Sequence, residues 1–163
     1  MSKQTKALPA ANPPANALPE VISKPGTNGP RLTGLAEFGG SEQRIGTSLD
    51  PTTAGGRKIL LASMNECDAR LTECVNKPIA VVDFIAHDVE LRNHTTGETK
   101  PAVRLVLVDA NGLTYECVSE TLLRSFQRLA SLFGPPPWSP PKTLTPMTKK
   151  KGEFSVYWFD VEE

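Results

Sequence analysis

The chain has 163 residues with 15 prolines and 12 glycines, and its 18 basic residues balance 18 acidic ones, so the formal net charge is zero. This length accommodates one domain and an additional segment, and a zero net charge neither favours nor excludes nucleic acid as a ligand. No stretch reaches the ~18 consecutive apolar residues of a membrane span, and the N-terminal residues lack the apolar region of a signal peptide. The sequence therefore predicts a cytoplasmic protein without a membrane partner.

The N-terminal third is rich in proline and glycine, and residues 1–32 contain no aromatic residue and no apolar periodicity. Ordering such a backbone costs roughly 1–2 kcal/mol per residue, and this composition buries too little apolar surface to offset that cost. We expect residues 1–55 to form a flexible arm. Between residues 31 and 49 a few apolar side chains leave two alternatives open: weak docking on the domain or a partner, or a continuation of the arm.

Residues 56–76 are predicted to form an amphipathic helix, because their apolar residues recur at spacings of four, three, four and three: Leu60, Met64, Cys67, Leu71 and Cys74. The helix should end before Pro78, since the residue preceding a proline avoids the helical conformation. Its apolar stripe needs a surface to cover it. With Cys117 the chain has three cysteines. Their number is odd and their spacing is not that of a zinc site, which favours buried thiols.

From Ile79 the sequence period changes to that of strands. The first strand, 79–91, has adjacent apolar pairs that break its alternation, which predicts a β-bulge. Asn111-Gly112 predicts a tight hairpin turn, Ser119 is a suitable helix N-cap, and Gly134-Pro135 ends that helix. The remaining predicted elements are a loop at 92–100, strands at 102–109 and 113–118, a helix at 119–133, a stiff proline-rich connector at 135–141, and strands at 142–148 and 153–161 around a turn at 149–152.

Five strands with one helix between the third and the fourth is the order of an oligonucleotide/oligosaccharide-binding (OB) barrel. The sequence therefore predicts a mainly β fold, with an OB-like domain over residues 77–163 that follows the amphipathic helix and the arm.

Ligands of OB barrels bind across strands 2 and 3, between the loops that join strands 1–2 and strands 4–5. The first loop here contains Arg92 and Lys100, and the second is the densest basic run of the chain, Lys149, Lys150 and Lys151. Strand 2 adds Arg104. Basic side chains neutralise phosphates by releasing counterions, and aromatic faces stack on bases, which is the combination that a single nucleic-acid strand needs.

The aromatic candidates leave alternatives open. Tyr115 alternates with Leu113 and Cys117, so it is equally a ligand contact or a core residue. Trp138 is a candidate for stacking on a base or for holding the proline-rich connector against the barrel. Tyr157 and Phe159 alternate with a second apolar set on the last strand, and the pattern does not decide which set faces inward.

Catalytic signatures are missing from the sequence. There is no glycine-rich phosphate loop after a strand, no GxSxG and no HExxH motif, and the two histidines, His87 and His94, lie in no catalytic pattern. We therefore expect a protein that is not an enzyme and that requires no metal and no cofactor.

Four stretches resemble the small single-stranded DNA-binding proteins of bacteriophages and mobile genetic elements. They are VDFIAHDVEL (82–91), LVLVDANGLTYECVS (105–119), LLRSFQRLASLFGPPPW (122–138) and the G-x-F-x-V of residues 152–156. The resemblance covers about half of the chain and does not include the proline-rich arm. It implies an OB-type fold and a role in coating single-stranded DNA during replication.

Two hypotheses follow. In the first, the protein binds single-stranded DNA, or RNA as a variant, and replication proteins are further candidate partners. The basic residues that would hold phosphates are Arg92, Lys100, Arg104, Lys149, Lys150 and Lys151. The aromatic residues that would stack on bases are Tyr115, Trp138 and Tyr157. In the second, the barrel and the proline-rich arm form a protein-interaction module. Free strand edges or the apolar stripe of the first helix could also support a homo-oligomer.

Overall fold

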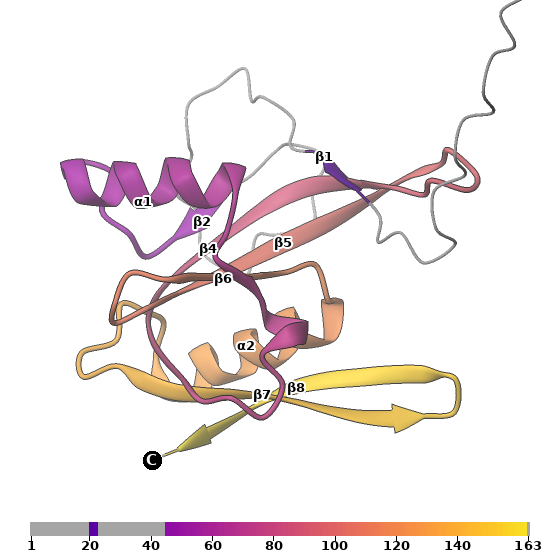
Figure 1. Ribbon diagram of the computed structural model, residues 1–163. Helices are drawn as coiled ribbons and strands as arrows, with labels where there is room; N and C mark the ends of the chain where they lie inside the picture. The colour runs from indigo at the N-terminus through magenta and orange to yellow at the C-terminus, as the bar shows by residue number, and fades with distance from the viewer. Residues whose placement is uncertain (1–19, 23–44, 163) are drawn as a thin grey trace, which may run out of the picture.

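The computed structural model describes residues 20–22 and 45–162. These form one curled, mainly antiparallel sheet with two α-helices (Figure 1). The elements are β1 (Glu20–Ile22), β2 (Ile45–Thr47), α1 (Ala54–Asn65), β3 (Ala69–Arg70), a 3₁₀ turn (Leu71–Glu73), β4 (Ile79–Arg92), β5 (Thr99–Asp109), β6 (Thr114–Cys117), α2 (Glu120–Phe133), β7 (Lys142–Lys151) and β8 (Phe154–Glu162).

The predicted order of five strands and one helix is confirmed, because β4, β5, β6, α2, β7 and β8 follow one another as expected. Three short strands, β1, β2 and β3, are additional to the prediction. The sheet runs β3-β6-β5-β4-β7-β8, and β1 and β2 also pair with β4. Among the described strands β3 and β8 lie at opposite ends of this path, so the sheet forms a half-barrel rather than a closed barrel of five strands.

Helix α2 covers the free edge of β8 with side-chain hydroxyls. The backbone N–H of Phe159 donates to Ser125 Oγ at 2.9 Å, and that of Tyr157 donates to Thr121 Oγ1 at 3.3 Å. Thr121 and Ser125 are one helical turn apart, so both hydroxyls lie on the same side of α2. The helix thus satisfies edge amides that a neighbouring strand would otherwise bond.

Strand β4 has the predicted bulge. Val81 pairs with Asp109 and Asp83 pairs with Val108, which leaves Val82 as the extra residue. The carbonyl of Val82 accepts a hydrogen bond from the backbone N–H of Trp138, in the proline-rich connector, at 2.9 Å. Beyond the bulge Phe84 and Ala86 face one hydrophobic cluster and Ile85 faces another. A strand that is buried on both faces has no clean alternation, which explains its adjacent apolar pairs.

The main core lies inside the half-barrel, around Phe126 of α2. The ring of Phe126 lies 5.6 Å from that of Phe84, 5.8 Å from that of Trp138 and 6.4 Å from that of Phe159. These tilted and edge-to-face contacts are the favourable geometries of aromatic pairs. One residue of α2 therefore joins β4, the connector and β8.

A second, smaller cluster lies on the other side of the sheet, between α1 and strands β4 and β5. Its buried members are Leu49, Leu60, Ile85, Val106 and Val108. Thr53 begins α1 as its N-cap, and its Oγ1 accepts a hydrogen bond from the N–H of Gly56 at 3.0 Å. The cluster places the apolar side of α1 on the outer face of the half-barrel.

The prediction of one helix over residues 56–76 was wrong in its second half, since α1 ends at Asn65. Asp68 accepts hydrogen bonds from the backbone N–H and the hydroxyl of Thr114, both at 2.8 Å, and the chain then runs parallel to β6 as β3. These tertiary bonds override the helical period. Leu60 is buried in the second cluster, whereas Leu71 and Cys74 are buried in the main core. The predicted stripe is therefore covered within the chain.

The predicted flexible arm falls mostly on residues 1–19 and 23–44, which lie outside the described residues. Within the described part, backbone hydrogen bonding pairs β1 with residues 90–92 of β4 and β2 with residues 85–87. Residues 45–53 thus belong to the layer that leads into α1.

Replacing Phe126 by alanine should lower the free energy of unfolding by about 3–5 kcal/mol, because it leaves a cavity among three aromatic rings. Leu132→Ala, on the same helix, is the matched control, since Leu132 is 78% exposed, and it should change stability by no more than about 0.5 kcal/mol. Urea denaturation of both variants measures the difference. Equal losses would contradict the central position of Phe126.

Candidate functional site

The β7–β8 hairpin presents two different faces. Tyr157, Phe159 and Val161 pack against the main core, whereas Phe154, Val156 and Trp158 alternate with them and face the opposite way. Phe154 is 76% exposed and Trp158 is 36% exposed. We call the side of the hairpin that bears Phe154, Val156 and Trp158 its outer face.

The register of the hairpin places lysines on this outer face. Lys151 is opposite Phe154, Lys149 is opposite Val156, and Met147 is opposite Trp158. Directly opposed residues of antiparallel strands have their side chains on the same side of the sheet. Cations and aromatic rings are therefore interleaved over the tip half of the hairpin, while Lys150 lies on the other side, opposite Ser155.

Of the residues predicted for this region, Lys149, Lys150 and Lys151 are exposed, and Tyr157 is half-buried against the main core. Sequence reasoning did not select Phe154 and Trp158. The alternation of the last strand separates its apolar residues into two sets on opposite faces. The alternation alone does not show which set faces the core and which is exposed. The contact of Phe159 with Phe126 decides that question.

The other predicted basic loop is the tip of the β4–β5 hairpin. Arg92 is opposite Thr99 and Lys100 is opposite Leu91, and both basic residues are exposed. The turn between them is held by Asn93, whose carboxamide oxygen accepts a hydrogen bond from the N–H of Thr95 at 2.9 Å. In the view of Figure 1 this hairpin and the β7–β8 hairpin both project toward the right-hand side of the molecule.

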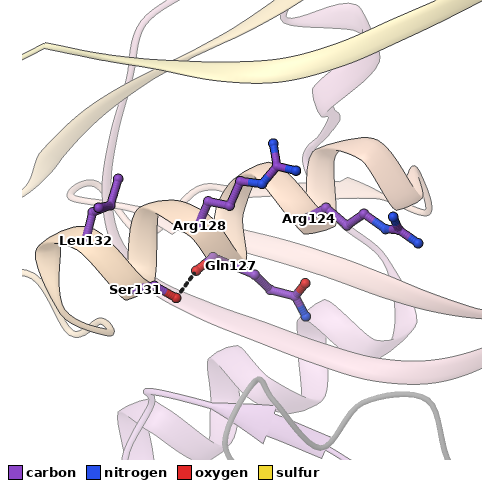
Figure 2. A pocket seen from close by; sticks show the side chains of 5 residues that line it. All are labelled: Arg124, Gln127, Arg128, Ser131 and Leu132. Atoms are coloured by element: carbon purple, nitrogen blue, oxygen red, sulfur yellow. Dashed lines mark hydrogen bonds between the residues drawn. The ribbon is translucent and has the colours of Figure 1, made fainter.

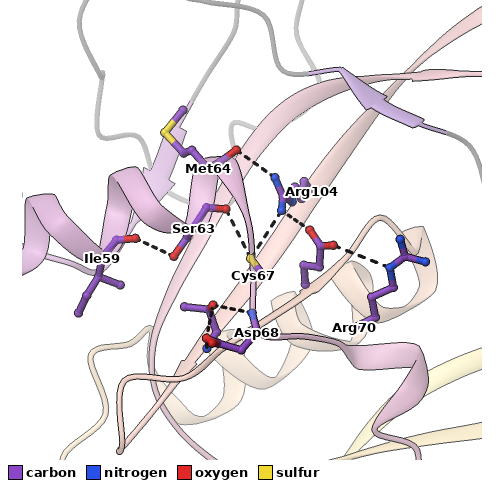
Figure 3. A network of polar contacts seen from close by, with 9 residues as sticks. Ile59, Ser63, Met64, Cys67, Asp68, Arg70 and Arg104 are labelled. Atoms are coloured by element: carbon purple, nitrogen blue, oxygen red, sulfur yellow. Dashed lines mark hydrogen bonds and ion pairs between the residues drawn. The ribbon is translucent and has the colours of Figure 1, made fainter.

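Arg104 is not available at the surface, which corrects its predicted position on an open binding face. It is only 5% exposed and forms an ion pair with Glu116 (Figure 3). Its Nη1 donates to the carbonyl of Met64 at 3.2 Å, and its Nη2 donates to Cys67 Sγ at 3.6 Å. Met64 lies in the last turn of α1, which has no basic residue of its own, so Arg104 supplies the positive charge that a helix C-terminus favours.

Tyr115 and Trp138 also serve the fold. The hydroxyl of Tyr115 donates to Asp109 Oδ2 at 3.2 Å, and its ring packs against the main core. The indole N–H of Trp138 donates to the carbonyl of Gly134 at 2.9 Å, and its ring is buried against Phe126. Trp138 thus holds the connector against the half-barrel, which was one of the two roles expected from its position.

The outer face of β5 and β6, where an OB barrel would be expected to bind its ligand, is covered. Val106 and Val108 are buried under α1, and their cross-strand partners are Glu116 and Thr114. Besides its ion pair with Arg104, Glu116 lies 4.0 Å from the Nε of Arg70. Among its described residues this face therefore offers neither an exposed aromatic ring nor an unpaired cation.

His87 is buried in the same layer, opposite Arg104 in the register of β4 and β5. Burial, together with the charge of Arg104, lowers the pKa of His87 from 6.5 to about 4. Its Nε2 has no hydrogen-bond partner among the described residues. The imidazole is therefore neutral at physiological pH, and it is unavailable for contact with a ligand.

Helix α2 has a shallow hollow on its outer side, lined by Arg124, Gln127, Arg128, Ser131 and Leu132 (Figure 2). Arg124 is paired with Glu120 one turn earlier. The hollow contains two arginines but no aromatic ring. It is a weaker candidate for a nucleic-acid strand than the outer face of the β7–β8 hairpin, where aromatic and basic side chains occur together.

None of the helices in the described part of the chain is long and apolar enough to cross a membrane. In that same part, histidine, cysteine, aspartate and glutamate residues nowhere form a group that could hold a metal ion. Burial raises the pKa of the Cys117 thiol to about 12, so this cysteine is an unreactive core residue.

A family model described as phage single-stranded DNA-binding protein matches residues 40–157. The match spans β2 to the middle of β8 and includes both hairpins. No curated protein and no solved structure shows a match to the chain.

The two arginines beside Glu116 should differ in their effect on stability. Arg104→Met breaks a buried ion pair and removes the contact with α1, so it should cost about 2–3 kcal/mol, less than a fully buried pair because Glu116 can regain water. Arg70→Met is the matched control and should cost about 0–1 kcal/mol, as for an exposed pair. Urea denaturation measures both, and equal costs would contradict the structural role of Arg104.

His87 should make the protein less stable in acid. The unfolded chain takes up a proton near pH 6.5 and the folded chain only near pH 4, so stability falls as the pH decreases through this interval. The loss at pH 4 should be about 2–3 kcal/mol. In His87→Gln the loss of stability between pH 6.5 and 4 should be smaller by that amount, whereas His94→Gln, at an exposed position, should show the same loss as the unmodified protein. Thermal melts across this range test the difference, and a slope unchanged in His87→Gln would refute it.

Proposed function

The chain belongs to the family of phage single-stranded DNA-binding proteins, and we propose that it coats single-stranded DNA during phage replication without catalysing a reaction. On this proposal the protein acts in the cytoplasm of the bacterial host, where the DNA is replicated. The family match supports single-stranded DNA as the partner, and the exposed cations of the two hairpins support a non-specific, backbone-directed mode of binding.

The observation on which the proposal chiefly depends is the run of three exposed lysines at the tip of the β7–β8 hairpin, Lys149, Lys150 and Lys151. Within the described part of the chain no acidic side chain forms an ion pair with them, so their charge is available to phosphates. Arg92 and Lys100 add two exposed cations at the tip of the second hairpin. Each phosphate that such a cation neutralises releases condensed counterions, which gives affinity without regard to base sequence.

The same arrangement explains how a chain of zero net charge can bind a polyanion. Long-range attraction requires only a local excess of positive charge. Three lysines outnumber Glu153 at the tip of the β7–β8 hairpin, and Arg92 and Lys100 outnumber Glu98 at the tip of the β4–β5 hairpin, so each tip has such an excess. The charge of Arg104, by contrast, is neutralised by its ion pair with Glu116, so Arg104 is not among the residues proposed to contact DNA.

Replacing Lys149, Lys150 and Lys151 together by alanine should weaken binding to a dT oligonucleotide and reduce its salt dependence. Single-stranded DNA contributes about −0.7 to the slope of log K against log salt per phosphate contact, so the loss of three contacts should reduce the magnitude of the slope by about 2. Fluorescence anisotropy at several salt concentrations measures this. Arg124→Ala/Arg128→Ala, on α2, is the control and should retain the slope of the unmodified protein.

An unchanged slope in the triple variant would remove the hairpin tip from the DNA contact. Failure of the unmodified protein to bind dT oligonucleotides at low salt would refute the proposed function itself.

A further inference from the structure

We propose that the DNA strand lies along the outer face of the β7–β8 hairpin, where Phe154 and Trp158 stack on its bases, and not across β5 and β6. This inference rests on the proposed function and specifies where on the molecule it takes place. It adds two base-contacting residues to the cations of the hairpin tip.

Both rings are exposed, Phe154 more so than Trp158. They lie on the face of β8 opposite to the one that packs against the main core. Exposed apolar surface in a cluster, rather than as single side chains, marks an interaction site. The rings are four residues apart on one strand, so their Cα atoms are separated by about 13 Å along it, and each can accept a different base.

Two lysines lie beside the rings on the same face of the hairpin. Lys151 is directly opposite Phe154, and Lys149 is opposite Val156, midway between the two rings. A strand whose bases stack on Phe154 and Trp158 therefore passes two ammonium groups on the same face. Aromatic platforms with a basic track beside them are the arrangement by which single strands are bound without sequence preference.

The same face also defines where the strand must leave. Beyond Trp158 the next residues on the outer face of β8 are Asp160 and Glu162, both exposed. Their carboxylates repel phosphates, so the favourable part of the face extends from the hairpin tip to Trp158. The rest of the path is expected to continue from the tip toward the other basic hairpin, away from the acidic end of β8.

The expected alternative, the outer face of β5 and β6, is covered. Helix α1 lies over Val106 and Val108 of β5, and Thr114 of β6 is bonded to Asp68. The guanidinium of Arg104 is bonded to Glu116 and to the carbonyl of Met64. Exposing that face would require breaking the second hydrophobic cluster. The outer face of the β7–β8 hairpin requires no rearrangement.

The two tryptophans of the chain make the proposal directly testable. Trp138 is buried in the main core, whereas Trp158 lies on the proposed contact face. Stacking on a base quenches indole fluorescence, so Trp138→Phe should retain the quenching caused by a dT oligonucleotide. Trp158→Phe should lose most of it while binding with nearly unchanged affinity, because phenylalanine can still stack. Anisotropy of the labelled oligonucleotide, measured in parallel, shows that the DNA is bound in each case.

Quenching that persists in Trp158→Phe would overturn the proposal, and binding measured by anisotropy in that same sample would leave the proposed function intact. The two failures are thus distinguishable.

A second measurement tests the other ring without relying on fluorescence. Phe154→Ala should weaken dT binding by roughly 5- to 100-fold, the range expected for one lost base–aromatic stack. Leu132→Ala is the matched control, since it removes an equally exposed apolar side chain from α2, and it should leave the affinity unchanged. Circular dichroism verifies that each variant is folded.

Equal affinities of Phe154→Ala and the unmodified protein would overturn the assignment. So would sedimentation showing that the free protein is a dimer which Phe154→Ala dissociates, because the face would then be an interface between two copies of the chain.

Discussion

Strand β4 is buried on both faces, and the rest of the architecture depends on this constraint. One edge of this 14-residue strand pairs with β5 along most of its length. The opposite edge pairs with β7, β2 and β1 in turn. The bulge at Val82 shifts the alternation by one residue, so Val81 and Phe84 both line the main core although they are three residues apart, while Ile85 contacts the layer under α1. Both hydrophobic clusters of the domain share this strand, and a strand buried on one face could support only one of them.

This two-sided burial determines which surface is left for a ligand. Because α1 covers Ile85, Val106 and Val108, it occupies the outer face of β4 and β5. The β7–β8 hairpin has only one face in the core, and α2 satisfies the amides of its free edge through Ser125 and Thr121. The hairpin is thereby fixed in position while its outer face stays open, which is the condition for a preorganised contact surface.

Polar groups in the covered layer show the cost of closing that face. Arg104 satisfies the C-terminal carbonyl of Met64 and neutralises Glu116, but its Nε and the Nε2 of His87 have no partners among the described residues. Unpaired buried polar atoms each reduce stability, and here they accompany an arginine that joins α1 to the sheet. Arg104 thus connects α1 to β6 through its bonds to Met64 and Glu116.

Some features of this fold depend on residues that are close in the sequence, and others depend on contacts between distant residues. Hairpin turns, helix caps and the order of strands depend on neighbouring residues, so Asn111-Gly112, Ser119 and the broken alternation around Val82 were sufficient to predict five strands, the intervening helix and the bulge. The exposed lysines at the hairpin tip followed in the same way, because turns project into solvent.

Which side of each element faces the core depends on tertiary contacts between residues that are distant in the sequence. The spacing of Leu60, Met64, Cys67 and Leu71 fits one helix, but the bonds from Thr114 to Asp68, 46 residues apart in the sequence, end that helix and turn the chain into β3. The side chain of Arg104 is of the type that binds phosphates, but it forms an internal ion pair because α1 lies over it. Phe154 and Trp158 become the exposed set of β8 only because Phe159 packs on Phe126, since a period of two residues defines two faces and not the direction of either.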